Sequence, residues 1–471
     1  MEIISWQFAL FASVVLGMYY VLPHRAQNYW LLLASYIFYL TWGWNFALVL
    51  LCLTTFNFLW ARLLTPEHSR RRLWLWIGII ANVTLLSFYK LNESEYAARF
   101  GLTTKFLLPI GLAFYTLQAI SYLVDIYNKV LPPTSNWADF FLYLSYFPKL
   151  LAGPIERARN FLPTLAKPRV VTNEKLAKAV ALIMIGLFRK IVIADVLSQL
   201  IVLEKAWVGW GANYSSPVLI LWLLSFAFAL YNDFAGYTSI VRGVSLVFGI
   251  ELAANFQQPY LSRNFAEFWN RWHVSFSHWL RDYIYYPLSR WLARLTGSQR
   301  NVLSVVAPPL VTMTVSGLWH GFHPYLLIWG GLHGLYQIVE RVWSLYFPVT
   351  PPDQQPRWRQ ALGTLTVFGF TTLAWVAFAM PTLRNGGSPY AFWRAMSVSA
   401  HWTEFGWEYL LVFLPIAFSL GLDAIQNYYR DEVIFLRWNI FARALLFAAA
   451  CLLLFIVSVG GAPREFVYQG F

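Results

Sequence analysis

The sequence contains little charge for its length and only two cysteines. Charged residues make up 12% of the 471 residues, whereas a soluble globular domain carries about 25% to cover its surface. No long polar stretch could form a separate soluble domain. Cys52 and Cys451 lie in apolar runs far apart in the chain, a spacing that argues against a disulfide framework or a cysteine metal site. We therefore expect free, buried thiols and a single membrane domain over residues 1–471.

Hydrophobic residues take the place of the missing charge. They make up 58% of the chain, and apolar runs near the length of a membrane-spanning helix, about 20 residues, recur throughout. The candidate segments are 5–22, 28–43, 45–61, 73–90, 104–126, 137–152, 176–201, 214–231, 236–250, 303–319, 323–346, 360–380, 406–425 and 438–460. Gly and Pro interrupt several of them, which is tolerated where helices pack on protein or line a cavity. The sequence predicts an all-α polytopic membrane protein with about 11 spans plus re-entrant and interfacial helices.

The chain is basic, with 35 Lys and Arg against 22 Asp and Glu. In a soluble protein this excess would suggest nucleic acid, but in a membrane protein it is typical of loops retained in the cytoplasm. We therefore expect membrane lipids around the chain and no nucleic-acid partner. The uncharged turn 43–45 joins the second and third segments, and basic residues follow the third: Arg62, Arg70, Arg71 and Arg72. This asymmetry predicts an extracytoplasmic N-terminus.

Residues 264–290 differ from the apolar segments around them. Large, mostly aromatic side chains recur at helical spacing on one face, and His273 lies among them: Phe265, Trp269, Trp272, His273, Phe276, Trp279 and Tyr283. Polar side chains lie broadly opposite. The pattern predicts one amphipathic helix, which lies at the membrane interface or lines a polar cavity.

Histidines cluster in the same part of the chain. Five of the eight lie between residues 273 and 333: His273, His278, His320, His323 and His333. A histidine inside a membrane segment is costly to bury, so it usually has a partner and often a function. His320 lies in an apolar segment between Gly317 and Gly321, which allow close backbone approach. From position alone, a core histidine held by a hydrogen bond explains it equally well.

Several kinds of chemistry fit the sequence poorly. Pro324 interrupts helical geometry beside His320 and His323, and no cysteine or nearby carboxylate completes a metal site; we expect no metal. There is no Walker-type phosphate loop and no Gly-x-Ser-x-Gly elbow. A histidine base that takes the proton of an attacking hydroxyl remains. The alternative class is a transporter with a histidine proton relay, which predicts ionisable residues along several spans and internal repeats; the sequence shows neither.

Seven stretches, taken in order, resemble the membrane-bound O-acyltransferase family. Three carry its signature: Phe268–His273, Trp279–Tyr285 and Gly317–Gly321. Four others, which come earlier in the chain, match as well: Leu108–Gln118, Phe147–Ile155, Gly186–Lys190 and Asp233–Tyr237. They most resemble the bacterial branch of alginate O-acetylation and teichoic acid D-alanylation proteins. The resemblance predicts a catalytic core over residues 105–335. One departure is Leu288–Trp291, where alginate-like members carry a Gly-Gly pair.

The resemblance implies roles for individual residues. His320 would be the essential histidine and general base, and His273 would orient the acyl group or stabilise the oxyanion. Arg281 and Asp282 would shape the cytoplasmic mouth, or form a plain surface ion pair. Asn270 and Trp319 are further substrate-binding candidates. For Asp233 and Tyr237 we expect structural hydrogen bonds rather than a catalytic role. The family fold implies a ring of tilted helices around a central tunnel, which donor and acceptor enter from opposite sides.

The resemblance also implies substrates and surroundings. We expect no tightly bound cofactor, and a cytoplasmic acyl thioester as donor: acyl-CoA, preferably acetyl-CoA, or a charged carrier protein. The acceptor hydroxyl would serve O-acylation of an extracytoplasmic polysaccharide or the cell envelope, relayed by a partner acetyltransferase outside the bacterial inner membrane. The extra C-terminal segments favour acetyl transfer over D-alanyl transfer from a carrier protein, which is the alternative.

Overall fold

The computed structural model describes residues 1–94, 96–102, 106–200, 216–347, 350–382, 388–398 and 407–460. These residues form helices and their connections, with no β-strand among them. Seven of the described helical segments are long and apolar enough to cross a membrane: Trp44–Leu64, Arg71–Glu93, Ser216–Val247, Val302–His320, Arg357–Ala379, Leu410–Tyr429 and Ile440–Val459. The chain is an all-α polytopic membrane protein, as predicted. The number of spans and the tunnel stay predictions.

The described chain groups into two compact units, which are Met1–Ile183 with Thr238–Ala254, and Met184–Tyr237 with Asn255–Phe471. Helices of the first unit are α1 (Trp6–Val21), α2 (His24–Leu40), α3 (Trp44–Trp60), α4 (Arg71–Glu93), α5 (Leu112–Tyr127), α6 (Trp137–Ser145), α7 (Phe147–Leu150), α8 (Ala158–Ala166) and most of α9 (Asn173–Leu187). Short turns η1 (Ala61–Leu64) and η2 (Ala97–Phe100) join them.

Two stretches that resemble the family meet in the first unit. Gly111 immediately precedes α5 with a φ of 83°, and a Cβ there would lie 2.2 Å from the Leu150 carbonyl oxygen. Lys149 is buried and donates from Nζ to the Gln118 side-chain oxygen and, at 2.6 Å, to the Tyr143 carbonyl oxygen. The close approach therefore requires glycine, and the buried lysine joins α5 to α6 and α7.

Helices of the second unit carry both candidate catalytic histidines. They are α10 (Val196–Leu200), α12 (Ser216–Val247, shared with the first unit), α13 (Phe265–Arg271), α14 (Val274–Leu280), α15 (Tyr286–Thr296), α16 (Val302–His320), α17 (Pro324–Tyr346), α18 (Arg357–Ala379), α19 (Pro389–Val398), α20 (Phe413–Tyr429) and α21 (Ile440–Gly460). The π-helices are η3 (Phe188–Asp195) and η5 (Arg281–Tyr285), and the short 3₁₀ turns are η4 (Pro259–Leu261), η6 (Pro352–Gln354), η7 (Met380–Thr382), η8 (Trp407–Val412) and η9 (Ile434–Arg437).

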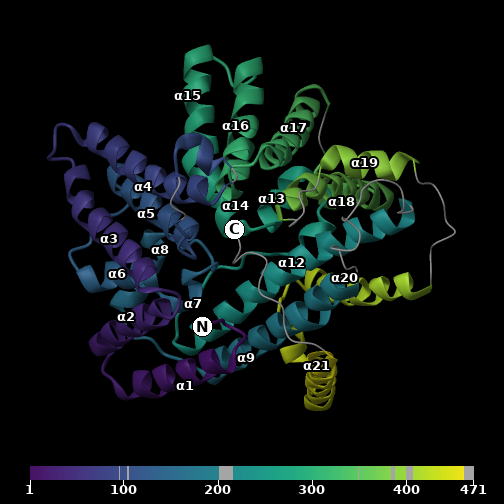
Figure 1. Ribbon diagram of the computed structural model, residues 1–471, viewed down its shortest axis with the longest axis horizontal. Coiled ribbons are helices and arrows are strands. Elements are labelled where there is room, and N and C mark those ends of the chain that lie inside the picture. The colour runs from purple at the N-terminus through teal and green to yellow at the C-terminus, as the bar shows by residue number, and fades with distance from the viewer. Residues whose placement is uncertain are drawn as a thin grey trace. The chain divides into compact units, whose positions relative to one another are not determined.

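α16 and α17 form a hairpin whose backbones touch (Figure 1). The chain turns at Gly321–His323, and Pro324 begins α17, so the predicted interruption is confirmed. A Cβ on Gly317 would lie 2.2 Å from the Leu326 carbonyl oxygen, and one on Gly330 would lie 2.3 Å from the Met313 carbonyl oxygen. Small residues at such contacts are typical of helix pairs in membranes.

Gly330→Ala is expected to destabilise the protein by about 1–3 kcal/mol, because the added methyl forces the two backbones apart. Gly331→Ala is the matched control, since a Cβ on Gly331 meets nothing within 4 Å. The measurement is the thermal unfolding midpoint in detergent. Equal midpoints for the two variants would contradict the close contact.

Three sequence predictions about these helices are wrong. Predicted segments 214–231 and 236–250 are not separate, since Ser216–Val247 is one helix, α12, whose central polar side chains have partners in the interior; residues 214–215 lie outside the described residues. Segment 137–152 divides into α6 and α7 at Tyr146. Both cysteines are exposed on helix surfaces rather than buried, because the outer face of a membrane helix is apolar. The ends of three other predicted segments, at residues 104–105, 201 and 406, lie outside the described residues.

Candidate active site

The predicted amphipathic helix over 264–290 is broken at His273. The residues instead form α13, α14, η5 and α15 in succession. His273 lies between α13 and α14 with φ 42° and ψ 53°, in the left-handed region. A non-glycine residue there costs about 1–3 kcal/mol and persists where its surroundings hold it. The break changes the direction of the chain and separates aromatic residues that the prediction placed on one face.

Asn255 holds this break in place. Its backbone oxygen accepts the Val274 N–H at 2.8 Å, and its side-chain oxygen accepts the Ser275 N–H at 3.2 Å. Asn255 is buried, and so is His273, which is only 1% exposed. The asparagine therefore fixes the start of α14 and, with it, the inward position of the imidazole. No sequence motif marks Asn255, since its partners lie far along the chain.

His320 is the last residue of α16 and lies among aromatic rings. Its ring centroid is 4.8 Å from that of Trp319, 5.0 Å from Phe378, 5.4 Å from Trp329 and 6.1 Å from Phe276. The side chain is 6% exposed. Trp319 lies on α16, Trp329 on α17, Phe378 on α18 and Phe276 on α14, so four helices contribute rings around His320.

The two candidate histidines flank the same aromatic pair. Phe276 and Trp319 pack at 4.3 Å between centroids, and each ring also contacts both imidazoles. For His273 these distances are 5.0 Å to Phe276 and 6.2 Å to Trp319, with Phe234 on α12 at 4.8 Å. The structure thus brings His273, Trp319 and His320 into one buried cluster. An imidazole in this setting is screened from bulk water while it keeps a nitrogen that can take a proton.

His333 extends the cluster along α17. It is fully buried, and its ring lies 5.1 Å from those of both Trp269 and Trp329. Neither of its ring nitrogens has a hydrogen-bond partner among the described residues. The sequence placed His333 in the histidine cluster but gave it no role. Its four-residue spacing from Trp329 is the signal that could have linked it to His320.

Asp233 and Tyr237 lie on α12 away from solvent. Lys190 donates from Nζ to Asp233 Oδ1 at 2.7 Å and to Asp195 Oδ1 at 2.9 Å, and all three side chains are nearly fully buried. Lys190 and Asp195 belong to the π-helix η3, and a π-helix often marks a functional region. Asp233 therefore accepts a hydrogen bond from Lys190, as expected for a structural residue. Phe234, the next residue on α12, contacts His273, so this ion-pair network lies behind one wall of the site.

The remaining candidates lie outside this buried cluster. Arg281 donates to Asp282 at 3.2 Å, as the sequence suggested, and both side chains are partly exposed. Asn270 is exposed on α13. His323 caps α17, with Nδ1 accepting the Tyr325 N–H at 3.2 Å. Within the parts of the chain that the structure describes, no three His, Cys, Asp or Glu side chains gather as metal ligands would.

Comparison with known proteins identifies the family to which the chain belongs. The model of the membrane-bound O-acyltransferase family matches residues 127–380. The chain is 32% identical to the probable alginate O-acetylase of Pseudomonas aeruginosa, over 80% of this chain and 71% of that protein. It is 32% identical to the peptidoglycan O-acetyltransferase of Helicobacter pylori, over 80% of this chain and 76% of that protein. It is 28% identical to the teichoic acid D-alanyltransferase of Streptococcus thermophilus, over 59% of this chain and 69% of that protein. The protein therefore belongs to the membrane-bound O-acyltransferase family and is an O-acyltransferase.

Proposed function

We propose that the chain moves an acetyl group from a cytoplasmic thioester to a hydroxyl, for O-acylation of an extracytoplasmic polysaccharide or the cell envelope. The observation that carries the proposal is the pair of buried histidines, His273 and His320, on either side of Phe276 and Trp319. Two relatives of similar identity are named as O-acetylating enzymes. We propose residues 105–335 as the catalytic core.

His320 acts as the general base in this scheme. Its imidazole takes the hydroxyl proton as the hydroxyl oxygen attacks the thioester carbonyl carbon. The new C–O bond forms, the C–S bond breaks, and the proton passes to the departing thiolate. General-base help of this kind contributes about 10²- to 10⁴-fold. The aromatic rings around His320 keep water away, so water does not replace the acceptor hydroxyl.

His273 acts as the positioning partner. Donors aimed at the developing oxyanion lower the barrier because they are held in place before the reaction begins. The left-handed backbone at His273 and the two hydrogen bonds accepted by Asn255 hold the imidazole in this way. Trp319 lies against both histidines and forms part of the acyl-binding wall.

The charge distribution of the second unit supports a cytoplasmic donor. Arginines gather at one end of the α16–α17 hairpin: Arg294 and Arg300 precede α16, Arg341 lies near the end of α17, and Arg357 begins α18. The opposite turn, Gly321–His323, contains neither Lys nor Arg. Basic ends face the cytoplasm, so we place the arginine end inside and the chain in the bacterial inner membrane, with its N-terminus outside.

A donor assay tests this function. Purified protein is incubated with an acceptor polysaccharide and one of three donors: acetyl-labelled CoA, a carrier protein charged with labelled acetyl, or a carrier protein charged with labelled D-alanine. We expect one donor to lose its acetyl group to a hydroxyl ester. Transfer of D-alanine but not acetyl would favour the alternative suggested by the D-alanyltransferase relatives. Proton-driven flux without any thioester consumption would support the transporter instead. An extracytoplasmic acetyltransferase is the partner we expect to receive the acyl group.

A further inference from the structure

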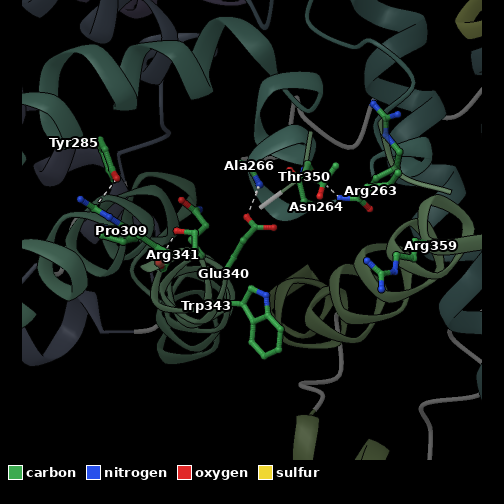
Figure 2. A pocket seen from close by; sticks show the side chains of 13 residues that line it. Arg263, Asn264, Ala266, Tyr285, Pro309, Glu340, Arg341, Trp343, Thr350 and Arg359 are labelled. Carbon is green, nitrogen blue, oxygen red and sulfur yellow. Dashed lines mark hydrogen bonds between the residues drawn. The ribbon is translucent and has the colours of Figure 1, made fainter. Parts of the chain in front are cut away.

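A carboxylate on α17 binds the first backbone N–H groups of α13. Glu340 accepts the Phe265 N–H on one oxygen at 3.1 Å and the Ala266 N–H on the other at 3.0 Å, and Figure 2 draws the second of these bonds. The side chain of Asn264 accepts the next N–H, that of Glu267, at 2.6 Å. The N–H groups in the first turn of a helix have no partner within the helix. These two side chains therefore satisfy the start of α13.

Glu340 has no other hydrogen bond in the part of the chain that the structure describes. It forms no ion pair there, although Arg263, Arg341 and Arg359 line the same polar pocket of about 650 Å³ (Figure 2). Both oxygens of the carboxylate are thus bound to the backbone of α13. Its negative charge suits this position, because the N-terminus of a helix carries a partial positive charge.

From this cap, α13 runs antiparallel to α17. The Phe265 ring stacks on that of Tyr336 at 4.9 Å between centroids. One turn further along α13, the Trp269 ring lies 5.1 Å from that of His333 and 6.0 Å from that of Trp329. Residue numbers therefore rise on α13 as they fall on α17, and the start of α13 lies beside the later turns of α17.

Both candidate catalytic histidines lie at the other end of this helix pair. His273 follows the last turns of α13, and His320 precedes α17 by the short turn Gly321–His323. The Trp319 ring contacts both imidazoles. α13 has only seven residues, a length of about 10 Å, which is too short for an isolated helix to be stable. Its position therefore depends on the groups that bind its two ends.

The two ends of α13 are bound by residues from different parts of the chain. Beyond its last turn, Asn255 accepts the N–H groups of Val274 and Ser275 and holds His273 in the left-handed region. At its first turn, Glu340 supplies the cap. A strained backbone persists only while its surroundings hold it. Loss of the cap would free the start of this short helix, and the strain at His273 would relax by a shift of α13.

We propose that Glu340 is a positioning residue for acyl transfer, because its carboxylate holds the start of α13 on α17 and thereby fixes His273 relative to His320. The proposal rests on the proposed function, since it acts through the role proposed for His273. Glu340 itself lies two turns of α17 beyond the buried His333 and does not contact the reacting groups.

Steady-state acetyl transfer by the purified full-length protein tests this role. Glu340→Gln should lower kcat roughly tenfold, because a glutamine amide accepts one N–H group and turns a donor towards the other. KM for the donor should change by less than about twofold, since no substrate contact is lost. Glu340→Asp keeps the carboxylate and should recover part of kcat. Gln337→Ala is the matched control and should keep the wild-type kcat, because Gln337 lines the same pocket one turn away without capping α13.

A double-mutant cycle separates positioning from a general loss of stability. If Glu340 acts through His273, adding Glu340→Gln to His273→Ala should lower kcat by less than about twofold, because the positioned group is already absent. A general effect on the fold would instead multiply the two losses. Multiplied losses would therefore overturn the positioning role, and so would a wild-type kcat for Glu340→Gln.

Amide hydrogen exchange gives a readout that does not require activity. Peptides that cover residues 264–274 should exchange faster in Glu340→Gln than in the wild type, because the start of α13 opens more often. Peptides from α5 should exchange at the same rate in both proteins, which excludes global unfolding. Unchanged exchange over residues 264–274 would overturn the cap.

The proposal and the proposed function can fail separately. Faster exchange over α13 in Glu340→Gln, together with a wild-type protein that transfers no acetyl, would support the cap and contradict the function alone. Acetyl transfer that His273→Ala slows and Glu340→Gln leaves unchanged would contradict the positioning role alone.

Discussion

Replacing His320 with alanine is expected to reduce acyl transfer by about 10²- to 10⁴-fold, to the background of the assay. The reason is that the hydroxyl then loses the group that takes its proton. His320→Gln is the companion variant, because it fills similar space among the rings of Trp319, Trp329 and Phe378 without supplying a base. Both variants should be produced and extracted in detergent like the wild type. Transfer is measured as labelled ester formed from the donor.

His273→Ala provides the comparison for this result. We expect a slower reaction with residual transfer clearly above that of His320→Ala, because a positioning group helps the reaction without carrying the proton. A loss as large as that of His320→Ala would show that the two roles are misassigned. Substantial transfer by His320→Gln would exclude the general-base role.

Lys190→Met is expected to destabilise the second unit by about 3–5 kcal/mol, because it leaves charged groups buried without their partner. Lys190 lies between Asp195 and Asp233, and each of these side chains is at most 4% exposed. The effect should appear as a large fall in the unfolding midpoint in detergent, or as failure to extract folded protein. Transfer should fall as well, since Phe234 beside Asp233 contacts His273.

Lys178→Met is the matched control for this substitution. Lys178 pairs with Glu251 at 2.7 Å, but its side chain is 31% exposed and that of Glu251 is 60% exposed. Exposed ion pairs contribute about 0–1 kcal/mol, so the midpoint should hardly move. If Lys190→Met unfolds at the wild-type temperature, the buried network does not stabilise the fold.

Features that depend on neighbouring residues could be predicted from the sequence. Apolar runs indicated a helical membrane protein, and Pro324 indicated the end of the helix that carries His320. Close backbone contact was expected at both glycines beside His320 and is found at Gly317, whereas Gly321 lies against the Leu326 side chain. The resemblance selected His273 and His320 as a pair, and the structure places them against the same two aromatic rings.

Features that depend on distant residues could not be predicted. The polar residues inside α12 looked like a helix break, yet Asn232 bonds to Ser419 and Asp233 to Lys190. The bend at His273 has no local signal, because a histidine in the left-handed region looks like any other histidine in a helical pattern. The pocket lined by Arg263, Glu340, Arg341 and Arg359 forms only because the fold brings α13, η5, α17 and α18 together, so no local pattern marks it.

Two requirements conflict at residue 273, because the backbone conformation favours glycine whereas the proposed role in transfer requires histidine. Its φ of 42° suits glycine best and tolerates asparagine or aspartate. A lineage selected only for a stable fold should therefore drift away from histidine here, because His→Gly would relieve about 1 kcal/mol or more of backbone strain. Retaining the imidazole keeps the protein less stable than its backbone allows. In relatives that have lost the activity, residue 273 should be among the first of the site to change.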